Sequence, residues 1–293
     1  MLKSIPDWAR GLAAAADVDL RLGSLRRIDS EARLRGLRSV EKGEVLALGR
    51  PLEGGTGQSH TGRQAFAIEV SVRDNEQVTE GVDRIELDCH GLGITHLDAL
   101  NHFGVQGRWY GGVDARSPQY SVSELASVGV VTRGIFLDIP AVRGTDWVAI
   151  DQPVDEDDLE SALRTADAAI EPGDALVVYM GRDRYEPAEG PLKPISRSPE
   201  GRPGIGTSGA RWLARQPISA LLWDMIDAYG GAEVPLSVHL LIWSQGLVLV
   251  DNCELGGASR AMAAKREKTA LVMVAPLNIP GGTGSAVNPL MMI

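Results

Sequence analysis

The 293-residue chain contains only two cysteines, Cys89 and Cys253. Two cysteines cannot form the disulfide framework of a small secreted domain, so we expect a reduced, intracellular protein. No stretch of the chain approaches the roughly 18 uninterrupted apolar residues that a membrane span needs. Asp7, Trp8 and Arg10 interrupt the first segment before the apolar core of a signal peptide could form. The sequence therefore predicts a soluble, cytoplasmic protein with no membrane partner.

An excess of basic residues is also missing. The chain has 29 Lys and Arg against 39 Asp and Glu, which gives a formal net charge of −10. Proteins that bind nucleic acids present a basic face to the phosphates. The acidic balance therefore argues against a nucleic-acid partner and against an anionic membrane surface. A hydrophobic share of 44% and a charged share of 23% are ordinary for a soluble, enzyme-sized chain.

No internal repeat and no low-complexity linker divides the chain. We expect one α/β domain over 51–293 and a helical N-terminal extension over 1–50. Short β-branched runs bounded by Gly, Pro or Asp predict strands, and segments with helical spacing fall between them. This alternation favours a mixed β core with flanking helices. The expected strands are 64–72 (half-buried), 130–139, 175–180, 219–225, 246–252 and 269–277, and the clearest helices are 28–37, 156–169, 207–216 and 258–270.

Three of the five histidines lie close together in the segment DCHGLGITHLDALNHF (88–103). His96 and Asp98 are two residues apart, so in an extended segment their side chains share a face and can hold one cation. If ALNHF then turns into a helix, His102 returns over the same point. Histidine and carboxylate are the ligand set of Zn²⁺, Mn²⁺ and Fe²⁺. The cluster predicts a site, whereas the isolated His60 indicates none.

The histidine segment resembles the hallmark of the cyclase family of metal-dependent hydrolases, which includes bacterial kynurenine formamidase and isatin hydrolase. LGITHLDALNH (92–102) matches the Thr-His-x-Asp and the last His of the family motif His-x-Gly-Thr-His-x-Asp-x-Pro-x-His. The lead-in (20–52) and the C-terminal APLNIPGGTGSAVNPLMMI (275–293) are also similar to family landmarks. The resemblance covers nearly the whole chain and is closest to the larger family members. It implies the family's swivelling β/β/α fold.

The resemblance implies roles for individual residues. His96 and Asp98 fall at metal ligands of the family, and His102 falls at a ligand or catalytic base. Farther along, the family uses a His followed by an acidic residue; His239 and Asp251, twelve residues apart, match this pair. Glu254 is an alternative to Asp251. The implied cofactor is a divalent metal ion, Zn or Mn, and the implied ligands are His96, Asp98, His239 and Asp251.

The sequence departs from the motif at one ligand position. Leu92 stands four residues before His96, where the smaller hydrolases have their first His ligand. His90 could move in across Gly91 and Gly93, or it could be a catalytic acid–base or substrate-contact residue. Loss of an imidazole weakens a metal site, since changes around the ligands alone cost about 10–100-fold in affinity. The departure keeps a site with little or no metal open as an alternative.

Three further residues are candidate substrate contacts. Arg182 follows the expected strand 175–180, where loops of an α/β sheet reach the ligand crevice, and could bind a carboxylate or carbonyl oxygen. Trp109 and Tyr110 follow the histidine segment and could line an aromatic-accepting pocket.

The glycine-rich GGTGSAVNP (281–289) lacks the lysine and the helix of a phosphate loop, so we expect a tight structural turn there.

The family resemblance implies an enzyme: a hydrolase that opens a C–N bond of an amide, imide or lactam, or a C–O bond of a lactone, in a small-molecule substrate. The metal would polarise the carbonyl, and His102 would take the proton of the attacking water. The alternative is a lyase or cyclase, for example a dehydratase, that uses His90 and His102 as an acid–base pair. A non-catalytic binding protein fits less well, because most of the acidic and imidazole positions are retained. The resemblance also implies a homodimer or a higher homo-oligomer.

Overall fold

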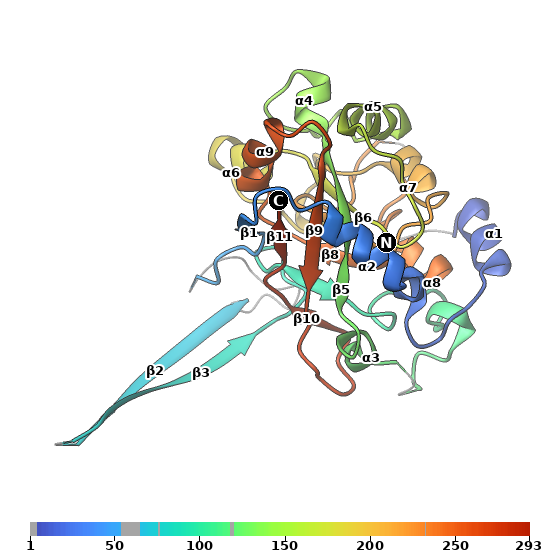
Figure 1. The fold of residues 1–293 in the computed structure, drawn as a ribbon. Helices are drawn as coiled ribbons and strands as arrows, with labels where there is room; N and C mark the ends of the chain where they lie inside the picture. Colours follow the sequence, from blue (N-terminus) through green and yellow to red (C-terminus); the bar gives the residue numbers. More distant parts are fainter. Residues whose placement is uncertain (1–4, 54–64, 76, 118–119, 232) are drawn as a thin grey trace.

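The computed structural model describes residues 5–53, 65–75, 77–117, 120–231 and 233–293. His60 lies outside these residues. The described chain forms an α/β fold around a nine-stranded mixed sheet, with helices on both of its faces (Figure 1). The predicted fold class, a mixed β core with flanking helices, is confirmed.

The sheet combines parallel and antiparallel pairing. In spatial order its strands are β1 (Val45–Ala47), β11 (Leu290–Met292), β9 (Thr269–Val274), β5 (Val130–Asp138), β6 (Ala175–Tyr179), β7 (Ala220–Trp223), β8 (Val248–Asp251), β4 (His96–Asp98) and β10 (Gly284–Ala286). The central strands β5 to β8 run parallel, and the strands beside them pair antiparallel. Because the parallel strands are buried on both faces, their sequences are almost continuously apolar.

Helices cover both faces of this sheet. In chain order they are α1 (Asp7–Ala15), α2 (Ser30–Arg38), α3 (Val122–Ala126), α4 (Ile139–Arg143), α5 (Glu156–Ala166), α6 (Arg182–Glu189), α7 (Thr207–Leu213), α8 (Leu240–Gln245) and α9 (Gly256–Ala263), with 3-10 turns at Gly23–Arg27, Tyr110–Gly112 and Ile195–Arg197. Leu137 of β5 packs in the core with α5, α7 and α8, and its neighbour Phe136 packs in the opposite core with α2 and α9. Among the described helices, none is long and apolar enough to span a membrane.

The elements expected from periodicity are present, with ends shifted by a few residues. The prediction of a tight turn over 281–289 is wrong in part, because the segment contains β10. This strand pairs antiparallel with β4, with Gly284 opposite Asp98. The signal was weak because three residues are too few to show an alternating pattern. Strand β10 therefore pairs with one edge of β4, and β8 pairs with the other edge.

Residues 5–50 pack on the same core. Helix α2 lies against β5 and β9, and β1 extends the sheet by pairing with β11. In the 3-10 turn before α2, the Ser24 hydroxyl donates a hydrogen bond to the backbone carbonyl of Ser219, 2.5 Å away. The segment is helical in large part, as expected. The division of the chain at residue 50 stays a prediction.

A two-stranded arm projects from the body of the molecule (Figure 1). It consists of β2 (Phe66–Asp74) and β3 (Thr79–Leu87), which pair antiparallel with each other and with no further strand of the described chain. The prediction that β2 is half-buried is wrong, since all but one of its residues are exposed. The alternation is real, however: Ile68 and Val70 share one face, and Ile85 lies opposite Ile68. One face of the arm is therefore apolar and exposed.

Leu137 and Leu37 form a matched pair that tests this assignment of the core. Leu137 is fully buried in β5, whereas Leu37 of α2 is 55% exposed. We predict that Leu137→Ala lowers the free energy of unfolding by about 2–5 kcal/mol, because it removes buried methyl groups and leaves a cavity. Leu37→Ala should change it by less than about 0.5 kcal/mol. Urea unfolding followed by circular dichroism measures both, and equal effects would contradict the assignment.

Candidate metal centre

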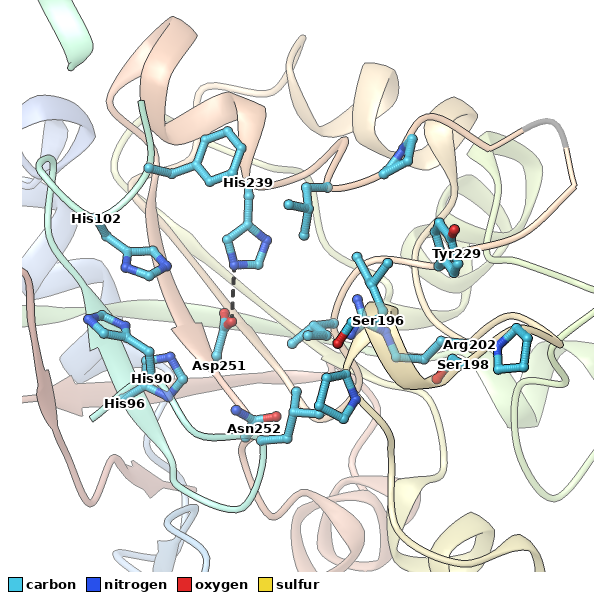
Figure 2. A pocket seen from close by; sticks show the side chains of 18 residues that line it. His90, His96, His102, Ser196, Ser198, Arg202, Tyr229, His239, Asp251 and Asn252 are labelled. Carbon is cyan, nitrogen blue, oxygen red and sulfur yellow. Dashed lines mark ion pairs between the residues drawn. The ribbon is translucent and has the colours of Figure 1, made fainter. Parts of the chain in front are cut away.

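Strands β4 and β8 and the start of α8 bring the predicted ligands together. His96 and Asp98 lie on β4, and the strand register places His96 opposite Asp251 of β8. His239 immediately precedes α8. Figure 2 shows the imidazoles of His90, His96 and His239 converging on one region beside Asp251. Residues that are far apart in the sequence thus form a single cluster of imidazoles and carboxylates.

Asp98 is at the centre of this cluster, and its side chain is fully buried. Its Oδ1 lies 3.0 Å from His90 Nδ1 and 3.4 Å from His96 Nε2. Its Oδ2 lies 3.7 Å from the Nε2 atoms of both His102 and His239. Within the described residues, Oδ2 has no hydrogen-bond partner. Because a buried polar oxygen without a partner is costly, this atom fits the role of a ligand to a cation.

Asp251 provides a second carboxylate from β8. Its Oδ2 lies 3.4 Å from His239 Nε2. One potential ligand atom from each of His96, Asp98 and Asp251 lies within 4.8 Å of the others, and all three residues are buried. Glu254, the alternative acid, is instead directed at an arginine 3.7 Å away. The structure therefore brings Asp251, and not Glu254, to the cluster.

Hydrogen bonds behind the cluster orient its side chains. His96 Nδ1 donates to a backbone carbonyl 2.8 Å away, which leaves Nε2 available as a ligand. His239 Nδ1 lies 2.5 Å from Asp227 Oδ2, so the Nε2 of this ring also faces the cluster. Trp223 Nε1 donates to Asp251 Oδ1 at 2.5 Å. Such partners are typical of metal-binding imidazoles and carboxylates. Asp227 and Trp223 are not predicted from the sequence, because neither belongs to a recognisable motif.

The charges of the cluster depend on one another. Burial alone would raise the pKa of Asp98, but the neighbouring imidazoles of His102 and His90 outweigh it and lower the pKa. Burial lowers the pKa of His102 to about 4, against the pull of Asp98. For His239, burial acts in the same direction, but Asp227 and a second carboxylate raise its pKa well above the ordinary value. Binding of a cation at His239 must therefore release a proton.

His90 and His102 lie on the open side of the cluster. Their rings stack with centroids 3.9 Å apart. Their side chains are 21% and 22% exposed, whereas no side chain of the predicted ligand set exceeds 7%. The segment after Asp98 forms a turn rather than the expected helix, with the His102 N–H donating to the Ala99 carbonyl at 2.9 Å. This turn returns His102 to the cluster, where it can meet a substrate.

The loop before β4 places His90 beside Asp98 and Leu92 on the wall of the pocket. Arg182 holds this loop: its Nη2 donates to the Leu92 carbonyl and its Nη1 to Asn252 Oδ1, both at 2.6 Å. Its Nε donates to a glutamate. The Arg182 guanidinium is therefore buried in internal contacts behind the loop. Its predicted role as a substrate contact has no support from this geometry.

The cluster lies at one side of a cavity of about 730 Å³ (Figure 2). Much of the remaining wall comes from the segment 194–199 and from Ile226, Tyr229, Pro235 and Leu236, which the sequence motifs did not predict. Trp109 and Tyr110, the other predicted substrate contacts, are not among the residues that line this cavity. Tyr110 is instead buried in a separate cluster. The apolar wall residues are Leu92, Phe103, Ile195, Ile226 and Leu236, together with three prolines, Pro194, Pro199 and Pro235.

Comparison with solved structures shows the same fold in other proteins. A crystal structure described as a novel cyclase is 20% identical, with a TM-score of 0.82 over 99% of this chain and 100% of that one. Isatin hydrolase A from Labrenzia aggregata, bound to benzyl benzoate, is 19% identical, with a TM-score of 0.62 over 88% and 95%. A potential metal-dependent hydrolase with cyclase activity is 17% identical, with a TM-score of 0.51 over 85% and 98%. No curated protein matches the chain.

The sequence also matches the family model described as "Putative cyclase" over residues 46–228. This range is more than half of the chain and contains the histidine segment 88–103. The resemblance inferred from that segment is thus confirmed. The protein belongs to the putative cyclase family.

Proposed function

We propose that the protein is a metal-dependent hydrolase that opens a C–N bond of an amide, imide or lactam, or a C–O bond of a lactone, in a small molecule. The observation that carries the proposal is the unpartnered, buried Oδ2 of Asp98 beside the Nε2 atoms of His102 and His239. The fold relatives that are an isatin hydrolase and a potential metal-dependent hydrolase support it.

The buried members of the cluster would hold the cofactor. Imidazole and carboxylate together suit Zn²⁺ or Mn²⁺, and both metals remain candidates on ligand type. When bound, the cation supplies Lewis acidity, which polarises a carbonyl group and lowers the pKa of water towards about 7. The proposed ligands are His96, Asp98, His239 and Asp251.

His102, on the open side of the cluster beside His90, would accept and donate protons. The low pKa of His102 keeps its imidazole neutral at neutral pH, so it can accept a proton from water and return it to the leaving nitrogen or oxygen. Both ring nitrogens of His90 form hydrogen bonds, Nδ1 with Asp98 Oδ1 at 3.0 Å and Nε2 with Thr283 Oγ1 at 3.0 Å. These bonds hold the His90 ring flat against His102 and so help to orient it.

The stacked pair of His90 and His102 favours a second candidate function. Two partly exposed imidazoles in contact could act as the acid and base of a lyase or cyclase, such as a dehydratase, without a catalytic metal. Leu92, in place of the first His of the motif, is consistent with that reaction. Hydrolysis and elimination differ in the fate of water, because only hydrolysis transfers a solvent oxygen to the product.

We also propose that the chain forms a homo-oligomer through the arm. The face formed by Ile68, Val70, Val72 and Ile85 is 48–69% exposed. An isolated two-stranded hairpin is marginally stable in water, and an exposed apolar strand surface favours association. A second copy of the chain is the simplest partner, because most oligomers are symmetric assemblies of identical chains.

Asp98→Asn tests the metal centre, since it keeps the shape of the side chain and removes its charge. We predict about one equivalent of Zn or Mn in the wild type and retention weaker by at least about 10–100-fold in the variant, because changes around the ligands alone already cost that much. Asp157→Asn, on the exposed side of α5, is the control and should keep the metal. Mass spectrometry of the purified proteins before and after dialysis against a chelator measures the metal. Full metal content in Asp98→Asn would contradict the proposed centre.

His102→Ala tests the base. We predict that it lowers kcat by about 10²–10⁴-fold on whichever cyclic amide, imide or lactone the wild type turns over, with the metal content unchanged. Turnover close to that of the wild type would remove His102 from the mechanism.

The wild-type reaction in H₂¹⁸O should place one solvent oxygen in the product. A product free of label, from a protein that binds no metal even after metal is added back, would establish the lyase instead.

Val70→Lys tests the arm. Val70 is 61% exposed and lies opposite Asp83, so a lysine there costs the isolated chain little but opposes burial against a second copy. We predict that light scattering after size exclusion gives a multiple of the 31.3 kDa chain mass for the wild type and the single chain mass for the variant. Glu69→Asp, on the other face of the arm, should keep the wild-type mass. A monomeric wild type would refute the proposal.

A further inference from the structure

Arg202 places a positive charge on the wall of the cavity. Its side chain is almost entirely buried, yet it is part of the cavity lining. Its Nε and Nη2 donate to the backbone carbonyl of Asp227 at 3.0 Å and 2.8 Å. The backbones of Arg202 and Tyr229 exchange hydrogen bonds of 2.8 Å and 3.0 Å. The guanidinium is therefore held in one position by the segment that also orients His239.

This guanidinium differs in its partners from Arg182, the other buried arginine among the described residues. Arg182 forms an ion pair with the carboxylate of Glu186 at 2.7 Å. Arg202 forms no such pair within the described residues; its guanidinium donates to a neutral backbone carbonyl instead. Burial lowers the pKa of Arg202 to about 10, which still leaves it charged at neutral pH. Asp227 and Asp251 attract this charge from a distance, but neither carboxylate forms a direct ion pair with it. A buried charge without a direct partner is costly, so its retention on a cavity wall points to a ligand.

The hydrogen-bonding capacity of Arg202 is also incompletely used. A guanidinium has five N–H donors in a planar fork. The two bonds to the Asp227 carbonyl use one donor of Nε and one of Nη2, and no acceptor in the described chain pairs with Nη1. The remaining donors of Nη1 and Nη2 lie side by side, which is the geometry that a carboxylate accepts with both oxygens.

The position of Arg202 in the cavity defines the shape of the ligand. Figure 2 shows Arg202, with Ser196 and Ser198, across the cavity from His90 and His102. Apolar side chains such as Ile226 contribute to the wall of the same cavity. The cavity thus has a reactive end, an apolar lining and a cationic end.

We propose that Arg202 binds a carboxylate group of the substrate, at the end of the molecule away from the bond that is broken. The substrate is then a small acid with an apolar body, and its amide, imide, lactam or lactone group faces the histidine cluster. The identity of the reactive group rests on the proposed function. The anionic anchor does not, because it depends only on Arg202 and its surroundings.

Phenylacetate and phenylacetamide test the anchor, because they share a body and differ in charge. Titration calorimetry is carried out on the full chain after treatment with a chelator, so that no metal competes for the carboxylate. We predict that the wild type binds the acid at least about tenfold more tightly than the amide, since charge-assisted bonds are the stronger ones. Arg202→Met should bind both equally. Arg184→Met, at an exposed arginine of α6, should keep the preference.

Each outcome decides the proposal. Equal binding of acid and amide by the wild type would overturn it. A preference for the acid that survives in folded Arg202→Met would place the carboxylate on the histidines and would also overturn it. If the methionine variant does not fold, Arg202→Gln retains a donor for the Asp227 carbonyl and removes the charge, and the same comparison applies. Failure of the metal centre would appear in the metal content of the wild type and would leave this preference intact.

Discussion

The buried carboxylate of Asp98 is the constraint around which the site is arranged. A charged oxygen removed from water needs compensation, and here the compensation comes from the imidazoles of four histidines. One oxygen nonetheless has no hydrogen-bond partner in the described chain. The surrounding residues already satisfy their own outer nitrogens and oxygens, as His239 does through Asp227. The unpaired oxygen of Asp98 therefore faces the interior of the cluster, where one cation can bind several of these groups at once.

The pairing of the strands in the sheet fixes the positions of the residues that surround this oxygen. Strand β4 is only three residues long, yet it lies between β8 and β10, so His96 and Asp98 cannot rotate away from the cavity. On one side it meets Asp251, and on the other side the chain just before β10 supplies Thr283, which holds His90. A short strand with two neighbours is therefore stiffer than its length suggests. The arm, which has no such neighbours, lacks this support.

The sequence predicted those parts of the site that depend on local spacing. The two-residue interval of His96 and Asp98 was sufficient to predict that their side chains share a face, because β4 is extended as expected. The position of His90 required the clamp from Arg182, and this contact joins residues 90 positions apart. Asp227, Arg202 and the wall over 194–199 could not be predicted, because their roles arise from long-range packing and leave no periodic pattern. The exposed face of β2 is a related case, since alternation shows which residues share a face but not what covers them.

The two ends of the cavity divide the chemistry between them. Under the proposed function, the histidine cluster would hold a cation that polarises a carbonyl and would move protons, which suits many amides and lactones equally and so gives little selectivity. We infer that selectivity comes from the opposite wall, where two hydrogen bonds hold the Arg202 guanidinium and prolines of 194–199 line the cavity. Because Asp227 bonds His239 through its carboxylate and Arg202 through its carbonyl, one residue sets the distance between the two ends. The length of the substrate is then fixed by the same contact that orients a proposed metal ligand.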